Sequence, residues 1–294
     1  MEYVEERRAA VEDHLRATLS RVEPAALRES LEHVTFAGGK RVRPTVTVLC
    51  CEAAGGEVWT GGTPESTLAP AGERALDFAV GIELVHSASL VVDDIIDRSE
   101  LRRGEQSAWA AFGYGDAIVA SDGLLGEAFA LFDADPRATT TVADAMIELG
   151  QGEASELVAK PESEEAYLRL ARRKTGALFR AAAELGAIAA DADDEVVAAF
   201  GEYAERVGVA FQIRDDVLDA TGDAERLGKP AGVDDEMDRP SVLRVTGRSV
   251  EEVNALADEQ RDAALAALDR IDGPTGHARD YLDDLAVFVV ERER

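Results

Sequence analysis

Residues 89–104 read SLVVDDIIDRSELRRG, a stretch in which three aspartates lie among apolar side chains. Asp93 and Asp97 are four residues apart, which places them on one face of an α-helix, with Asp94 beside them. The flanking valines and isoleucines predict that this helix is largely buried. Carboxylates gathered in such a place repel one another and need a compensating charge.

The rest of the chain has helical period and almost no strand period. Apolar residues three and four apart predict helices at residues 10–22, 24–36, from 44 onward, 74–97, 115–133, 137–158, 164–189, 194–221, 249–271 and 277–291. Segments rich in glycine and proline, such as 55–73 and 222–240, separate them. We therefore expect an all-α fold, a large single-domain helical bundle of about ten helices over residues 1–294.

The composition is acidic and poor in lysine. The 294 residues include 59 acidic and 31 basic side chains, which give a net charge of −28. Because the acidic excess is spread along the chain, it favours a protein adapted to concentrated salt, where screening shortens the range of self-repulsion. A docking surface for a basic partner is the alternative, and so negative a surface argues against a nucleic-acid partner.

The cysteines and the hydropathy indicate a cytoplasmic protein. Cys50 and Cys51 are the only cysteines and are adjacent, so we expect no disulfide framework and a reducing compartment. We find no signal peptide. No apolar run approaches the roughly 20 residues of a transmembrane segment.

The aspartate pattern of the first stretch occurs three times, as DDIID (93–97), DDVLD (215–219) and DDEMD (234–238). The second copy has the same apolar flanks as the first. Mg²⁺ would compensate the repulsion among the carboxylates of these two motifs, because it takes oxygen ligands and bridges a few carboxylates to substrate phosphates. The third copy lacks a sustained apolar period, and we interpret it as a solvated loop.

Basic residues next to glycines form a second kind of motif. They are GGKRVRP (38–44), LRRG (101–104), RRKTG (172–176) and LGKP (227–230). Such residues suit phosphate, because glycine lets the backbone approach closely and the cations match the oxyanions. Surface salt bridges are the alternative for any one cluster. However, three of the four lysines of the chain fall in these motifs.

From about residue 36 to 245, these motifs resemble, in order, the trans-isoprenyl diphosphate synthases, also called polyprenyl synthetases. The resemblance implies the isoprenoid synthase fold, with two aspartate-bearing helices facing each other across a central cleft. It also implies a Mg²⁺-dependent prenyltransferase that condenses isopentenyl diphosphate head-to-tail (1′–4) with an allylic diphosphate (dimethylallyl, geranyl or farnesyl). Members of this family are usually homodimers, and we expect one here.

The resemblance also implies roles for individual residues. Three Mg²⁺ ions would be held by Asp93, Asp94, Asp97, Asp215, Asp216 and Asp219. The isopentenyl diphosphate would contact Lys40, Arg43, His86 and Arg103. The allylic diphosphate would contact Arg102, Lys174, Thr175 and Lys229, with Gln212 nearby. The expected catalytic residues are Asp93, Asp94, Asp97, Lys174, Asp215 and Asp216. In GQGEASEL (150–157), Gln151 would face the cleft.

The residues before the first aspartate motif bear on product length, and one later segment departs from the family pattern. Val85, Ala88 and Ser89 precede the first motif, and their small size leaves the product tunnel open, which predicts a geranylgeranyl (C20) or longer product. Past Asp234 the family reads Gly-Lys-x-Thr, whereas this chain reads DRPSVL (238–243), with Arg239 and Ser241 at the comparable places. A basic residue and a hydroxyl remain, so we expect activity.

Two other functions are consistent with the motifs taken singly. A terpene cyclase or head-to-head synthase uses aspartate-rich helices but needs no isopentenyl site, and GGKRVRP and Arg103 argue against it. A catalytically silent regulatory subunit of a heteromeric synthase commonly lacks one aspartate triad, and both are intact here.

Overall fold

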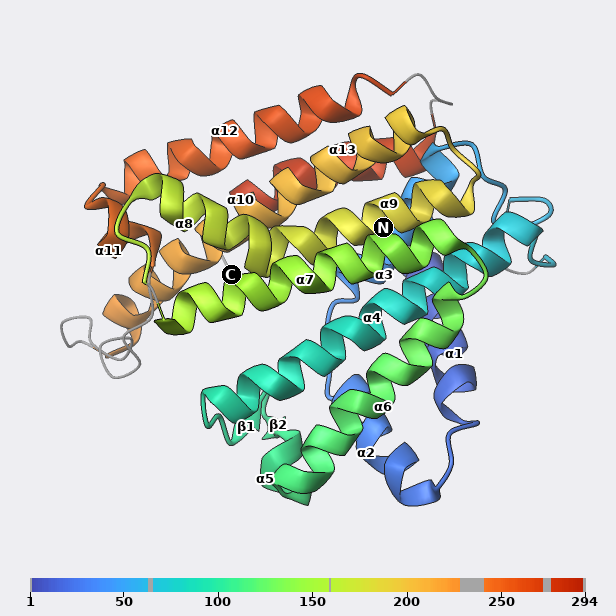
Figure 1. The fold of residues 1–294 in the computed structure, drawn as a ribbon. Helices are drawn as coiled ribbons and strands as arrows, with labels where there is room; N and C mark the ends of the chain where they lie inside the picture. The colour runs from blue at the N-terminus through green and yellow to red at the C-terminus, as the bar shows by residue number, and fades with distance from the viewer. Residues whose placement is uncertain (1, 63–65, 159, 228–240, 272–275, 293–294) are drawn as a thin grey trace. The chain divides into compact units, whose positions relative to one another are not determined.

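The computed structural model describes residues 2–62, 66–158, 160–227, 241–271 and 276–292, and its regular structure is almost entirely helical (Figure 1). The α-helices are α1 (Glu2–Leu19), α2 (Ala25–Phe36), α3 (Val42–Ala53), α4 (Pro70–Ile96), α5 (Ala108–Phe112), α6 (Tyr114–Phe132), α7 (Pro136–Val158), α8 (Glu164–Ala171), α9 (Ala177–Ala189), α10 (Asp194–Leu227), α11 (Val242–Thr246), α12 (Val250–Leu268) and α13 (His277–Glu291). The segment η1 (Arg172–Gly176) is a π-helix, and β1 (Leu101–Arg102) pairs with β2 (Glu105–Gln106). The predicted all-α fold is confirmed.

Some elements differ from the sequence prediction. The first helix begins at Glu2 instead of residue 10, and the helix expected at 164–189 is divided by η1 into α8 and α9. The β1–β2 hairpin was not predicted, because two-residue strands are too short to show alternation. Its turn places Arg103 at φ +55° and Gly104 at φ +88°. Two consecutive positive φ angles are those of a type I′ turn, which matches the twist of a hairpin.

The chain divides into two compact units. Unit 1 comprises residues 1–140 and 185–192, and unit 2 comprises residues 141–184 and 193–294. The single domain and the central cleft expected from the sequence stay predictions.

Unit 1 is organised around α4, which packs against α1, α2, α3 and α6. The helix has 27 residues, and Phe78, Ile82 and Leu84 are fully buried in it. Gly81 permits the close approach of α6, because a Cβ there would lie 2.5 Å from Cζ of Phe132. This packing fixes the C-terminal end of α4, where the first aspartate motif lies.

Within the described residues, α4 alone is long and apolar enough to cross a membrane, with a mean hydropathy of 1.6 over its most apolar window. This differs from the prediction that no apolar run approaches the length of a transmembrane segment. However, 72% of that window is buried inside the protein. This is the burial expected of a core helix.

Unit 2 is organised around α10, which packs against α8, η1, α11, α12 and α13. Its core joins Tyr167 of α8 to Ile213 and Val217 of α10, and to Val242 of α11 and Val253 of α12. The second aspartate motif lies on the same stretch of α10 as these core residues.

Candidate active site

The loop before α3 approaches the β1–β2 turn in unit 1. Gly38 and Gly39 have φ angles of +98° and +135°, which suit glycine. A Cβ on Gly39 would lie 2.6 Å from Nη1 of Arg103. Arg103 donates a hydrogen bond to the carbonyl of Gly38. The GGKRVRP and LRRG motifs therefore meet in unit 1, and the resemblance to the polyprenyl synthetases had assigned Arg43 and Arg103 to one substrate.

His86 accepts a hydrogen bond from Arg43 in the same unit. Nη1 of Arg43 lies 3.1 Å from Nε2 of His86. Burial, reinforced by the charges of Arg43 and Arg103, holds the pKa of His86 well below its usual range. Burial also lowers the pKa of Arg43 to about 10, so the guanidinium stays charged at neutral pH. A neutral imidazole thus accepts from a charged guanidinium.

The buried aspartate of the first motif is Asp94, which is 3% exposed. Arg102 reaches it with two nitrogens, at 2.7 Å from Nε to Oδ2 and 2.7 Å from Nη2 to Oδ1. Trp109 donates to the backbone carbonyl of Asp94 over 3.0 Å and so ties α5 to the end of α4. Asp93 and Asp97 are half-buried.

Some of these side chains line one pocket of unit 1. Its polar lining includes His33, Glu83, His86, Asp94, Arg102 and Arg103. The structure therefore brings together four of the predicted site residues. Lys40 is exposed and does not line this pocket.

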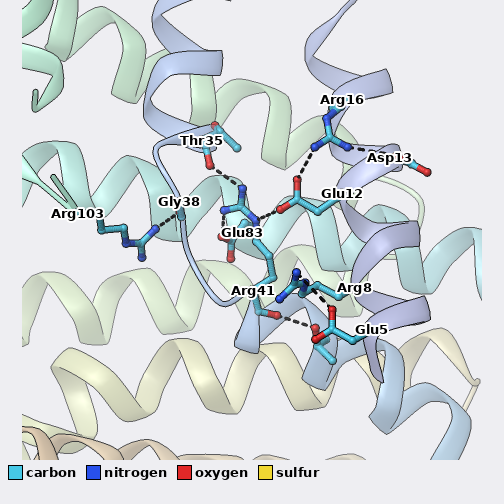
Figure 2. A network of polar contacts seen from close by, with 11 residues as sticks. Glu5, Arg8, Glu12, Asp13, Arg16, Thr35, Gly38, Arg41, Glu83 and Arg103 are labelled. Carbon is cyan, nitrogen blue, oxygen red and sulfur yellow. Dashed lines mark hydrogen bonds and ion pairs between the residues drawn. The ribbon is translucent and has the colours of Figure 1, made fainter. Parts of the chain in front are cut away.

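Arg41 is a buried cation that the sequence analysis did not assign to the site (Figure 2). Its guanidinium contacts Oε1 of Glu12 at 2.7 Å, Oε1 of Glu83 at 2.6 Å and the carbonyl of Thr35 at 2.7 Å. These partners come from α1, α4 and α2, so Arg41 fixes the start of α3, the helix on which Arg43 lies. They are far apart in the sequence, which leaves no local pattern to reveal them.

The predicted chain-length residues differ in exposure. Val85 and Ala88 are each 1% exposed. Ser89 is half-buried, and its hydroxyl donates to the carbonyl of His86 over 2.8 Å. Ser89 is therefore the position of the three where a larger side chain can be added at the smallest cost to packing.

A second pocket lies in unit 2 and gathers the second aspartate motif with the RRKTG lysine. Its lining is Glu156, Tyr167, Leu170, Ala171, Lys174, Gln212, Asp215, Asp216, Asp219 and Ser241. The predicted metal ligands of the second motif thus share a cavity with Lys174 and Gln212. Ser241, from the segment that departs from the family pattern, lines it as well.

Asp216 is the most constrained carboxylate of this pocket. Tyr167 donates to Oδ2 over 2.7 Å, and the backbone N–H of Val242 donates to the same oxygen over 2.8 Å. Gln212 donates to Oδ1 over 2.9 Å and accepts from the hydroxyl of Thr175 over 2.8 Å. Burial raises the pKa of Asp216, and these hydrogen bonds oppose the rise. Tyr167 was missed, because it lies outside every motif.

Lys174 is held by two carboxylates of α7. Its Nζ lies 3.3 Å from Oε1 of Glu153, and it also pairs with Glu156. A Cβ on Gly152 would lie 3.1 Å from the backbone nitrogen of Lys174, so α7 approaches η1 closely. The spacing of the two glutamates in GQGEASEL is the signal that could have found them. Gln151, expected to face a cleft, is exposed and does not line this pocket.

Asp215 forms an ion pair with Arg292, the last residue that the structure describes. Nη2 of Arg292 lies 2.6 Å from its Oδ1, and the Arg292 guanidinium stacks on Phe211 with its carbon 3.9 Å from the ring centre. Arg292 is 8% exposed. No local sequence pattern indicates this contact, because it joins positions 77 residues apart.

Some predictions fall outside the described residues. They are Lys229 with its segment GKPAGVD (228–234), the third motif DDEMD (234–238) and Arg239.

The comparisons with known proteins now identify the family. The model of the family described as Polyprenyl synthetase matches residues 24–269. The chain belongs to the polyprenyl synthetase family. Polyprenyl synthetases are prenyltransferases, so this chain is a prenyltransferase of the polyprenyl diphosphate synthase type, as the sequence predicted.

Two relatives match nearly the whole chain. A short chain isoprenyl diphosphate synthase of Methanothermobacter thermautotrophicus is 32% identical and covers 96% of this chain and 95% of its own length. A geranylfarnesyl diphosphate synthase of Aeropyrum pernix is 34% identical and covers 96% of this chain and 90% of its own length.

Two solved polyprenyl synthetases have the same fold. The geranylgeranyl pyrophosphate synthetase of the archaeon Geoglobus acetivorans has a TM-score of 0.84 at 27% identity, over 98% of this chain and 99% of that chain. The polyprenyl synthase of Caulobacter crescentus CB15, complexed with calcium and isoprenyl diphosphate, has a TM-score of 0.82 at 28% identity, over 99% of this chain and 96% of that chain. The predicted isoprenoid synthase fold is confirmed.

Polyprenyl synthetases depend on Mg²⁺, and the unit 2 pocket has suitable donors. Mg²⁺ keeps several waters and typically binds one or two carboxylates together with substrate phosphates. Asp215, Asp216 and Asp219 supply carboxylate oxygens beside Lys174. Among the described residues, no three His, Cys, Asp or Glu side chains converge to hold a metal on their own. The donors therefore fit a cation bound together with a diphosphate.

Proposed function

We propose that the protein condenses isopentenyl diphosphate head-to-tail with an allylic diphosphate to give a trans-polyprenyl diphosphate. The observation that carries the proposal is that each unit has a pocket lined by both acidic motif residues and basic side chains. The unit 1 pocket has Asp94 with Arg102 and Arg103. The unit 2 pocket has Asp215, Asp216 and Asp219 with Lys174. A reaction that joins two diphosphate substrates and expels one pyrophosphate needs both kinds of group.

The acidic side chains would hold the metal that the reaction needs. Mg²⁺ would be held by the aspartates of the first two motifs, and three ions are expected from the family. When bound, Mg²⁺ supplies positive charge that stabilises the pyrophosphate as it departs. Lys174 and Arg102 add fixed positive charges on the side of the allylic diphosphate. Asp94, held by Arg102, is oriented before substrate binds.

The basic pocket of unit 1 would bind the second substrate. Arg103 of this pocket, and Arg43, which contacts His86 of the pocket, would offer guanidinium groups to the isopentenyl diphosphate. Arg41 fixes the start of α3, the helix that carries Arg43. The allylic C–O bond breaks, pyrophosphate leaves, and the double bond of isopentenyl diphosphate attacks the carbocation to form the new C–C bond. Loss of a proton, which pyrophosphate accepts, completes the product.

The product is a geranylgeranyl (C20) or longer diphosphate. Small or short side chains at positions 85, 88 and 89 support this length. So does the similarity to relatives named geranylfarnesyl diphosphate synthase and geranylgeranyl pyrophosphate synthase. We further propose that the chain acts as a cytoplasmic homodimer.

The test is elongation by the isolated chain. Purified protein with Mg²⁺, labelled isopentenyl diphosphate and each allylic primer is expected to give a labelled product, resolved by chromatography. The product should disappear when EDTA is added. Asp216→Asn should lower kcat at least a hundredfold, whereas Asp284→Asn, at an exposed site on α13, should not. If the wild type elongates no primer in low or high salt, it is a silent subunit; cyclised hydrocarbon products would indicate a terpene cyclase.

A further inference from the structure

The hydrogen bonds of Asp216 extend to a tyrosine outside the sequence motifs. We propose that Tyr167 is a positioning residue that sets the orientation of the Asp216 carboxylate toward the divalent cation. This proposal rests on the proposed function, because it takes Asp216 as a cation ligand.

The contacts of Asp216 fix both of its oxygens. Oδ2 accepts from Tyr167 at 2.7 Å and from the backbone of Val242 at 2.8 Å. Oδ1 accepts from Gln212 at 2.9 Å. An ionised carboxylate offers about two acceptor positions on each oxygen. Oδ2 is therefore fully used, whereas Oδ1 keeps one position, and this is the oxygen we expect to face the cation.

Tyr167 and Gln212, the two side chains that donate to Asp216, are themselves held in place by their neighbours. Tyr167 is 2% exposed and packs in the unit 2 core with Ile213, Val217 and Val242. Its hydroxyl therefore has little freedom to leave Asp216. Gln212 is oriented in turn by Thr175, whose hydroxyl donates to its side-chain oxygen over 2.8 Å. α8, η1, α10 and α11 thus all contribute to the position of one carboxylate.

Removal of one hydroxyl tests this arrangement. Tyr167→Phe deletes the donor and keeps the ring in the core. Loss of a hydrogen-bonding partner behind a metal ligand typically weakens metal affinity or activity 10–100-fold. The matched control is Tyr203→Phe, which deletes a buried hydroxyl in the same unit that donates to the carbonyl of Leu282 over 2.6 Å, away from the pocket.

Calorimetric titration with inorganic pyrophosphate at about 1 mM and about 10 mM Mg²⁺ measures the effect without turnover. We expect Tyr167→Phe to bind pyrophosphate about tenfold more weakly at the lower Mg²⁺ concentration, with most of the affinity restored at the higher one. In turnover, the Mg²⁺ concentration for half-maximal rate should rise about tenfold while kcat at saturating Mg²⁺ stays near that of the wild type. Tyr203→Phe should match the wild type in both measurements.

Thermal unfolding in EDTA establishes that each variant is folded. If Tyr167→Phe does not fold, Thr175→Val takes its place, since it removes the hydroxyl that orients Gln212 and should shift Mg²⁺ dependence in the same direction. Equal Mg²⁺ dependence in Tyr167→Phe, or in Thr175→Val where it is used instead, and in Tyr203→Phe overturns the positioning role and leaves the proposed function intact. Absence of Mg²⁺-dependent pyrophosphate binding in the wild type overturns both.

Discussion

Arg102 and Asp94 form a two-pronged ion pair, with 2.7 Å from Nε to Oδ2 and 2.7 Å from Nη2 to Oδ1. Asp94 is 3% exposed, so the Arg102 guanidinium replaces most of the water that would otherwise contact this carboxyl group. The two residues are 8 positions apart in the sequence, and the segment between α4 and β1 brings the arginine back to the helix that carries the aspartate. The pair therefore stabilises unit 1 as well as the expected substrate site.

Arg102→Gln should destabilise the protein by about 2–3 kcal/mol, because it leaves a buried carboxylate without its cation. Urea unfolding measures the change. Arg16→Gln is the control, since Arg16 is 59% exposed and its pairs with Glu12 and Asp13 are of the surface kind. Its loss should cost less than about 1 kcal/mol. Equal effects of the two substitutions would contradict the structural role of the Arg102–Asp94 pair.

His86 should make the protein less stable as the pH falls below about 6.5. Its pKa is depressed in the folded state by burial and by Arg43, so below that pH only the unfolded state takes up the proton. Between about pH 7 and 5.5, the wild type should lose about 1 kcal/mol more stability than His86→Gln. His277→Gln, at the exposed start of α13, is the control. Parallel pH profiles for the wild type and His86→Gln would rule the effect out.

Glu184 should make the protein less stable as the pH rises, which is opposite to the effect expected of His86. It lies in unit 2 near Arg180, whose guanidinium also contacts Glu148 and Glu205 at 2.8 Å and 3.1 Å. Burial raises the pKa of Glu184 to about 7. The folded state then holds a proton that the unfolded state releases, so this contribution is lost as the pH rises from about 4.5 to 7.

Glu184→Gln should therefore flatten the stability profile over that interval, by on the order of 2 kcal/mol relative to the wild type. Chemical unfolding at a series of pH values gives the comparison. Glu165→Gln, at an exposed position of α8, should leave the profile unchanged. A wild-type profile that falls no faster than that of Glu184→Gln would show that Glu184 is ionised throughout.

Ser89→Phe should shorten the product by at least one isoprene unit. Ser89 is half-buried and precedes Asp93 by one helical turn, so an aromatic ring there would obstruct a growing chain below the aspartates. Chromatography of the products from one primer measures the length, with Ser89→Ala as the control. Ala88→Phe is a poorer test, because Ala88 is 1% exposed and overpacking costs about 1–3 kcal/mol. Products of unchanged length would show that Ser89 does not line the product tunnel.

The net charge of −28 should make stability depend on salt. Raising KCl from about 0.1 M to about 3 M shortens the screening length from about 10 Å to below 3 Å, which weakens self-repulsion in the folded state. We expect the melting temperature to rise by at least 10 °C. Sucrose solutions of the same water activity are the control, because sucrose is excluded from the protein surface but does not screen charges. A melting temperature that falls with KCl would contradict adaptation to concentrated salt.

The sequence predicted the helices well, because most of them have a long apolar face. The resemblance to the polyprenyl synthetases, more than the residue chemistry of the motifs, implied that Arg43 and Arg103 lie close together, since it assigned both to the isopentenyl diphosphate. Glu153, Glu156 and Tyr167 escaped notice for a different reason. Their importance lies in what they contact, namely Lys174 and Asp216, and only the packing of α7 and α8 on their neighbours creates those contacts.

Contacts between residues far apart in the sequence could not be predicted either. Arg292 and Asp215 are joined only after α13 has packed on α10. In the same way, Arg41 looked equivalent to its neighbours in GGKRVRP, although it faces the protein interior while Lys40 is exposed. Adjacent residues on a turn point in different directions, and composition does not reveal which one is buried.

The π-helix η1 has a consequence for how this chain tolerates deletions. Each residue of an α-helix advances the direction of the side chains by about 100°. Deleting one residue from Arg172–Gly176 would let α8 and α9 join as a regular helix, and all of α8 would then rotate by that amount about its axis. The ring of Tyr167 would leave the core and its hydroxyl would lose Asp216, so a chain shortened here by a single codon would leave Asp216 with two of its three hydrogen-bond donors.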